Sequence, residues 1–345
     1  MKIEEILTGI LIICSVMLFI LLCIYFFTIY RKNSKKRNFN KINNYIQQNE
    51  RDWYNYLVLN KPLRNHSTTK NELEAIDSMF VSYVTSTDKE EILERASTYA
   101  ALNMKNYYMN QLTSRDEAVR LQALQRTLIL ELEFLVPLIE RRLKENRTGS
   151  MEEYLLMLKV ASKYNENLFL AHMYKPRLPF LNDEYNKLLL NLDEMYAEYF
   201  KDNFEELPIH LKYAYLESLC LNRNLSIGYL HLFERLLESD CAEIRIRALR
   251  AISSYGEISD LKHYENFVRS SLWEERLLLA EILRFVTEQA SYTYLGTLLL
   301  DPNGNVRKQA ALSLMDLPEG KAVLQQVSES EGENLAATTA GETEQ

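Results

Sequence analysis

The stretch LLLDPNGNVRKQAALSL, residues 298–314, carries the clearest structural signal in the chain. Its Asp-Pro pair at 301–302 ends one helix, because proline cannot continue a helix, and Gly304 allows a tight connection to the next one. Three apolar residues then follow at i, i+4 and i+8, on one face of a second helix: Val306, Ala310 and Leu314. The stretch therefore predicts two helices that pack across a short turn.

The same pattern recurs with a period of about 31 residues, and four positions of the second helix keep their register in three copies. They are Ile244, Glu275 and Val306; Arg245, Arg276 and Arg307; Ala248, Leu279 and Ala310; and Ile252, Leu283 and Leu314. The preceding helix repeats in the same frame, with Phe233, Tyr264 and Leu295 aligned. The period predicts consecutive helix pairs over residues 226–317.

Weaker copies of the pattern lie earlier in the chain, as AVRLQAL at 118–124 and LKYAYLESL at 211–219. Five capping boxes announce further helix starts: Thr87 with Glu90, Ser114 with Glu117, Ser150 with Glu153, Asp240 with Glu243, and Ser271 with Glu274. Alternation typical of strands is nowhere sustained. We expect an all-α chain in which about five helix pairs form a curved stack, an α-solenoid.

The Asp-Pro turn at 301–302, followed by Val306, Arg307 and Ala310, resembles the HEAT repeat. The length of the period is most similar to that of the short bacterial HEAT-like repeats, including those of the phycobilisome-lyase type. The resemblance covers residues 226–317 firmly and 113–142 less closely.

The resemblance also implies a structural role for an aspartate and an arginine, which tie the turn to the second helix. Asp301 and Arg307 suit this role, and Arg245 and Arg276 occupy the equivalent arginine position in the other copies. Serine replaces the aspartate in those two turns, at 239 and 270, which leaves the turn contact there open.

A membrane anchor is predicted at the amino end. Residues 6–30 contain no charged side chain, and as a helix they span about 37 Å, enough to cross a hydrocarbon layer of roughly 30 Å. A cleaved signal peptide would have a shorter apolar run and a small-residue cleavage site, whereas this run ends in Phe26, Phe27 and Tyr30. We expect the segment to stay in the lipid bilayer.

Basic residues follow the apolar segment and predict its orientation: Arg31, Lys32, Lys35, Lys36 and Arg37. The amino side carries Lys2 against Glu4 and Glu5. Because an excess of Lys and Arg next to a span stays in the cytoplasm, we expect a single-pass protein of the cell membrane with its bulk in the cytoplasm. The cluster also suits binding of anionic lipid headgroups, although a topology signal alone explains it equally well.

Four segments follow from these patterns. Residues 1–37 form the anchor with its basic flank, 38–112 the juxtamembrane and amino-terminal capping helices, and 113–318 the HEAT-like domain. Residues 319–345 form an acidic tail, predicted to be disordered because it is poor in bulky apolar side chains.

The net charge and the motif content limit the classes of function that the chain can have. Residues 38–345 hold 34 basic and 46 acidic side chains, a formal charge of −12, which argues against nucleic acid as a partner. The five histidines lack the spacing of a zinc set, and no motif for phosphate, dinucleotide or serine nucleophile chemistry occurs. We expect no catalytic residue, cofactor, metal or small-molecule substrate.

Stacked helix pairs instead favour a docking surface, and tyrosine is enriched where proteins meet proteins. The residues expected to contact a partner are Tyr196, Tyr199, Tyr213, Tyr215, Arg247 and Arg250. The prediction is a scaffold or accessory subunit that binds a protein at the membrane. By resemblance, transmembrane HEAT-like proteins of bacteria accompany membrane glycosyltransferases, which makes such a system a candidate partner. The alternative is a HEAT-like enzyme, lyase-like or nucleic-acid-modifying, with a site assembled from distant residues.

Overall fold

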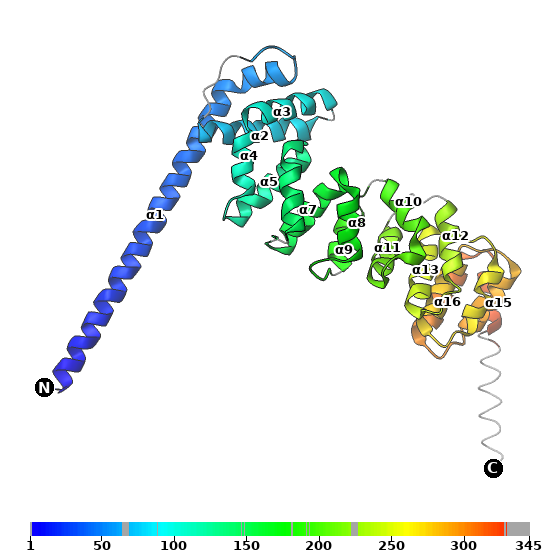
Figure 1. Ribbon diagram of the computed structural model, residues 1–345. Coiled ribbons are helices and arrows are strands. Elements are labelled where there is room, and N and C mark those ends of the chain that lie inside the picture. The colour runs from blue at the N-terminus through cyan, green and yellow to red at the C-terminus, as the bar shows by residue number, and fades with distance from the viewer. Residues whose placement is uncertain are drawn as a thin grey trace. The chain divides into compact units, whose positions relative to one another are not determined.

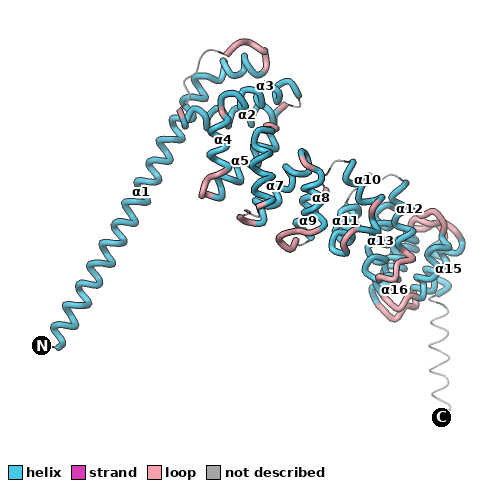
Figure 2. Tube along the Cα trace, in the orientation of Figure 1, coloured by secondary structure: helices cyan, strands magenta, loops and turns pink. Residues whose placement is uncertain are grey.

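The computed structural model describes residues 2–63, 69–87, 89–145, 147, 149–180, 182–190, 192, 194–221, 227–327 and 329. Every regular element in this part of the chain is a helix, so the all-α prediction is confirmed there (Figure 2). The chain divides into two compact units, Met1–Glu166 and Asn167–Gln345. This boundary falls inside residues 113–318, which the sequence predicted to be one domain.

The first unit begins with one long helix, which shorter helices follow along the chain (Figure 1). Its elements are α1 (Lys2–Leu57), α2 (Lys70–Ser86), α3 (Glu90–Asn103), α4 (Lys105–Leu112), α5 (Glu117–Ile129), the 3-10 helix η1 (Glu133–Leu135), α6 (Val136–Lys144) and α7 (Met151–Tyr164). Helices α1 to α5 pack on one another in chain order, and both α5 and α6 pack on α7.

Helix α1 joins the apolar segment to the folded part of the first unit without interruption (Figure 1). It is long and apolar enough to cross a membrane, and its described side chains from Met17 to Tyr30 are exposed. At its other end Trp53 and Leu57 are fully buried. The Trp53 ring meets Phe80 and Tyr99 edge to face, with centroids 5.3 and 5.0 Å apart. The apolar segment is therefore continuous with a helix anchored in the core.

The second unit contains the strongest repeat. Its elements are α8 (Glu166–Tyr174), which begins at the boundary, α9 (Asn182–Leu189), α10 (Glu194–Asp202), η2 (Phe204–Glu206), α11 (Ile209–Leu221), α12 (Ile227–Leu236), α13 (Ala242–Tyr255), η3 (Leu261–Arg269), α14 (Trp273–Leu283), α15 (Gln289–Leu298) and α16 (Gly304–Asp316). The second helices α13, α14 and α16 begin at equal intervals, at 242, 273 and 304. The period read from the sequence is thus the period of the helix pairs.

The capping boxes predicted the presence of helices better than their starts. Ser150 caps α7 as expected, since its hydroxyl accepts a hydrogen bond from the Glu153 amide at 3.3 Å. The other four helices begin one or two residues later than predicted, with N-caps at Lys89, Asp116, Cys241 and Leu272. Local turns explain the delay at Ser114, whose hydroxyl accepts from the Asp116 amide instead.

Beyond α16, residues 320–327 are helical, although the predicted acidic tail begins at 319. The rest of that tail, apart from Glu329, lies outside the described residues.

Candidate docking groove

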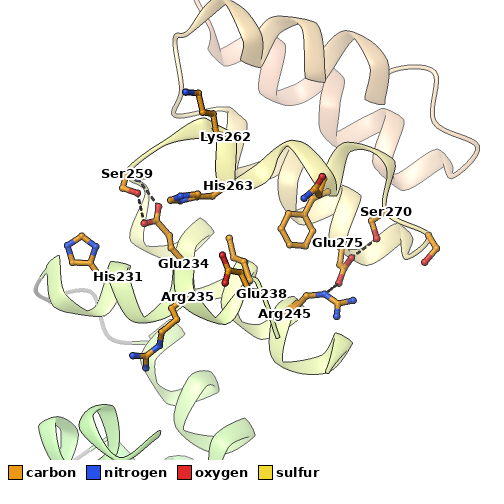
Figure 3. Close-up of a pocket in the computed structure, with 14 residues that line it drawn as sticks. His231, Glu234, Arg235, Glu238, Arg245, Ser259, Lys262, His263, Ser270 and Glu275 are labelled. Atoms are coloured by element: carbon orange, nitrogen blue, oxygen red, sulfur yellow. Dashed lines mark hydrogen bonds and ion pairs between the residues drawn. The ribbon is translucent and has the colours of Figure 1, made fainter. Parts of the chain in front are cut away.

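A groove of about 820 Å³ lies in the second unit between α12 and η3, beside the start of α14 (Figure 3). It is placed between the first helices of two successive pairs. Besides serines, six exposed polar side chains line it: His231, Arg235, Glu238, Lys262, His263 and Asn266.

The residue spacing on α12 and η3 explains which of these side chains share a helix face. His231 and Arg235 lie four residues apart on one face of α12, and Glu238 follows in the turn. On η3, His263 and Asn266 lie three residues apart, which places them one above the other because a 3-10 helix has three residues per turn.

One wall of the groove is fixed by the buried carboxylate of Glu234 on α12. Its Oε1 accepts hydrogen bonds from the Ser259 amide at 2.8 Å and the Tyr264 hydroxyl at 3.1 Å, and its Oε2 accepts from the Ser259 hydroxyl at 2.5 Å. Burial and the nearby carboxylate raise the pKa of Tyr264. Glu234 therefore joins α12 to the loop before η3 and has a structural role.

The opposite edge is fixed by Glu275 at the start of α14 (Figure 3). Its carboxylate pairs with Arg245 Nε at 2.8 Å and accepts a hydrogen bond from the Ser270 hydroxyl at 2.5 Å. The charges that hold the groove together are therefore satisfied within the protein.

The six exposed lining side chains, by contrast, make no side-chain hydrogen bond or ion pair within the described part of the chain. They comprise two cations, two imidazoles, one amide and the carboxylate of Glu238. Such a set suits binding of acidic groups, with Glu238 and Asn266 available to accept or donate single hydrogen bonds. Three His, Cys, Asp or Glu side chains able to hold a metal ion are not brought together among the described residues.

The arginines assigned to the repeat form a recurring bridge. In α13, α14 and α16, Nη1 of the arginine donates to a main-chain carbonyl of the preceding turn: Arg245 to Ser239 at 2.8 Å, Arg276 to Ser270 at 2.6 Å, and Arg307 to Asp301 at 2.6 Å. The acceptor is the main chain, so a serine serves as well as the aspartate of the family pattern. The turn contact left open by the sequence is thus present in all three copies.

Asp301 has a different role from the one implied by the resemblance. Its carboxylate does not contact Arg307 but reaches back to Arg276 of the preceding pair, at 2.5 and 3.0 Å. It also accepts from the Asn303 amide at 2.8 Å. Although burial raises its pKa, the hydrogen bond from Arg276 brings the pKa of Asp301 below its ordinary value. Asp301 therefore connects two repeats, and within its own turn its carboxylate bonds the Asn303 amide and not Arg307.

A matching bridge in the first unit was missed by the sequence analysis. Arg120 on α5 donates to the main-chain oxygen of Ser114 at 2.9 Å and pairs with Glu153 on α7 at 2.9 and 2.8 Å. Arg142 on α6 pairs with the same carboxylate. The signal was available, because Arg120 lies in the AVRLQAL copy of the pattern and Glu153, like Glu275, is the third residue of its helix.

The predicted partner contacts divide into buried and accessible residues. Tyr196 and Tyr215 are core residues, with 1% and 2% exposure, which corrects their assignment to a contact surface. The Tyr215 hydroxyl donates to the Ala197 carbonyl at 2.7 Å, so burial satisfies its polar tip. Tyr199 and Tyr213 are half-buried.

Arg247 and Arg250 are tied to the neighbouring helix. Arg247 pairs with Glu217 at 2.8 Å and with Glu243 at 2.7 Å, and its guanidinium lies 5.1 Å from the ring centroid of Tyr213. Arg250 is half-exposed and lies 3.5 Å from Glu217. Arg250 is therefore the more accessible of the two cations.

The basic flank lies on α1, where Lys32, Lys36 and Arg37 are exposed. The side chains of Arg31 and Lys35 lie outside the described residues.

The sequence did not identify the groove, since each of its histidines is isolated along the chain. The repeat could have revealed it, because a shift by one period places Lys262 at the position of His231 and Asn266 at that of Arg235.

No model of a known protein family matches the chain, and no curated protein matches it. Among solved structures, it is similar to a crystal structure of an engineered protein from the Northeast Structural Genomics Consortium. The two are 15% identical over 76% of this chain and 77% of that one, with a TM-score of 0.32. This likeness is too distant to carry an argument about fold or function.

Proposed function

We propose that the chain is a membrane-anchored cytoplasmic scaffold or accessory subunit that binds an acidic segment of a partner protein in the groove between α12 and η3. The proposal rests on a difference between the charged groups of the groove, some of which are paired within the protein while others are not. Its wall carboxylates, Glu234 and Glu275, are satisfied internally, whereas Arg235 and Lys262 are exposed without a partner among the described residues. Unpaired cations over a preformed groove favour an anionic ligand.

The membrane part of the proposal rests on α1. Its apolar segment and basic flank precede a helix end that is buried in the first unit, so the anchor would hold the folded units close to the bilayer. Tethering raises the effective concentration of a membrane-proximal partner and strengthens a weak contact. A membrane glycosyltransferase system is the partner class that the HEAT-like resemblance favours. The equal spacing of α13, α14 and α16 supports the HEAT-like assignment itself.

Photo-crosslinking in native membranes tests the docking groove. A photoreactive amino acid at Asn266, inside the groove, is compared with one at Glu265, which is exposed on the same helix but does not line the groove. We expect Asn266 alone to capture one specific protein, through an acidic segment of it. Charge reversal of Arg235 and Lys262 should abolish this product, while reversal of the exposed Arg269 on η3 should preserve it.

Capture of the same proteins from both positions, or capture that survives the double reversal, would contradict the proposal. The mass of the mature protein tests the anchor in parallel, because a chain shortened before residue 31 would show a cleaved leader.

The enzyme alternative has less support from the groove. The Ser259 hydroxyl donates to Glu234, so His263 does not accept its proton as a general base would. The other lining hydroxyl that meets a base, Ser270, donates to Glu275, and the charge of that carboxylate is already paired with Arg245.

A further inference from the structure

The last arginine of the repeat, Arg307, makes only half of the bridge. Like Arg245 and Arg276, it donates to its own turn, at 2.6 Å to Asp301 and 3.0 Å to Pro302. In the two earlier copies the other edge of the guanidinium pairs with a carboxylate of the following pair. That edge of Arg307 is exposed and has no acceptor within the described residues.

The surface beside Arg307 is uncovered in the same way. Leu249 on α13 and Ala280 on α14 are fully buried, and the next second helix packs on each of these two helices. The equivalent residue on α16 is Ala311, which is partly exposed. Leu312 and Met315 beside it are 46% and 63% exposed. This face of α16 thus has the character of a contact surface without its covering element.

The chain beyond α16 begins a further helix pair in the same register. Residues 320–327 are helical, and α15 begins one period earlier, at Gln289. Val323 packs against α15, because its Cγ1 lies 3.7 Å from where a Cβ on Gly296 would stand. A shift by one further period moves the turn position of Asp301 to 332, which is flanked by Glu331 and Glu333.

We propose that the acidic segment after residue 329 docks on this face of α16 and that Glu331 or Glu333 pairs with Arg307, as Asp301 pairs with Arg276. Register and charge both favour this occupant. The segment from 328 to 345 contains five glutamates and no Lys or Arg, and Arg307 and Lys308 are exposed cations on α16. Glu331 and Glu333 follow residue 329 by two and four residues, which is about 7–14 Å of extended chain.

A zero-length crosslink tests the placement on the full chain in detergent micelles. Carbodiimide joins a lysine to a carboxylate only where the two are in contact, and Lys308 adjoins Arg307. We expect amide links from Lys308 to Glu331 or Glu333 within one chain, and none from the groove lysine Lys262. Mixing chains of two isotopic masses separates intramolecular from intermolecular links. Links between chains, which would indicate a second copy, or no link to Lys308, would overturn the proposal.

A double-mutant cycle tests the ion pair itself. Arg307→Gln also weakens the turn, so its effect alone does not decide the question. We expect Arg307→Gln and the pair Glu331→Gln with Glu333→Gln each to speed hydrogen exchange of α16 by about two- to five-fold. Combined, they should give no further increase, because both remove one interaction.

Arg269→Gln, at an exposed arginine of η3 that does not line the groove, serves as the matched control and should combine additively with the glutamate variants. Additive effects at Arg307 as well would overturn the pairing. Neither test measures binding in the groove, so a failure here is separable from a failure of the proposed docking function.

Discussion

The same carboxylate position is satisfied in different ways in the two units. In the first unit, Glu153 pairs with two arginines, Arg120 and Arg142, and its side chain is fully buried. In the second unit, Glu275 pairs with Arg245 alone and takes a hydroxyl hydrogen bond from Ser270. A buried carboxylate must have its charge and its lone pairs satisfied, but a second cation and a serine serve equally well. What recurs is therefore the geometry of the bridge and not the identity of its partners.

Removal of the charge at Glu153 should have the largest effect on stability. Glu153→Gln leaves two mostly buried guanidinium groups close together without their counter-charge, which should lower the unfolding free energy of the first unit by about 3–5 kcal/mol. Urea titration of the full chain in detergent measures this through Trp53, after replacement of Trp273 with Phe so that one tryptophan remains. A loss below about 1 kcal/mol would show that the arginines find other acceptors.

The equivalent change in the second unit should cost less. In Glu275→Gln one arginine loses its counter-charge, while the amide oxygen still accepts hydrogen bonds, so we expect a loss of about 1–3 kcal/mol. Hydrogen exchange of α13 and α14 reports it. Glu281→Gln on the same helix, where no ion pair is present in the described structure, should change the stability by no more than about 0.5 kcal/mol. Equal effects of Glu153→Gln and Glu275→Gln would contradict the comparison.

Acid should weaken both units through their bridged carboxylates. Burial alone would raise the pKa of Glu153, but the hydrogen bond from Arg120 and the charge of Arg142 lower it, and the pKa of Asp301 is also lowered. A pKa depressed by folding adds stability that is present above the unfolded value, near 4, and is lost as the pH falls through the folded value. Urea midpoints between pH 7 and 3 should therefore drop below about pH 4. In the first unit Glu153→Gln should flatten this drop.

The smallest expected effects concern two serine hydroxyls, Ser270 in the second unit and Ser150 in the first. Ser270→Ala removes one hydrogen bond from Glu275 and should cost about 1 kcal/mol in the second unit. Ser150→Ala removes a helix cap in the first unit, which is worth a similar amount, but leaves the arginine pairs of Glu153 intact. Only Ser270→Ala should accelerate exchange at Arg245 and its neighbours. Acceleration around Arg120 in Ser150→Ala would argue that the cap also supports the bridge.

The second helices were predictable because their period is written in the spacing of apolar residues. Val306, Ala310 and Leu314 are buried as their spacing required. Helix starts were less predictable, since Ser114 and Asp116 compete for the same cap and only the local turn decides between them.

The tyrosines illustrate a second limit of the sequence. Tyr213 and Tyr215 are two residues apart, and packing buries one and leaves the other half-exposed.

The groove required the structure, because it depends on residues from elements that are distant along the chain. His231 and His263 each look isolated in the sequence, and they line one groove because the hydrogen bond from Tyr264 to Glu234 joins η3 to α12. The burial of Glu234 was equally unpredictable from the sequence. A glutamate on a helix is usually exposed, and its burial depends on donors that Ser259 and Tyr264 bring from the next element.

The all-α class, the apolar amino-terminal helix, the period of the repeat and the arginine of each second helix were predictable from the amino-acid sequence. These features repeat locally, through helical periodicity and turn chemistry, so neighbouring residues suffice to reveal them. The packing of the helices was needed to show which carboxylate each arginine meets and which charged side chains remain free in the groove. Those outcomes depend on contacts between elements, where burial penalises every unpaired charge and packing selects the partner that satisfies it.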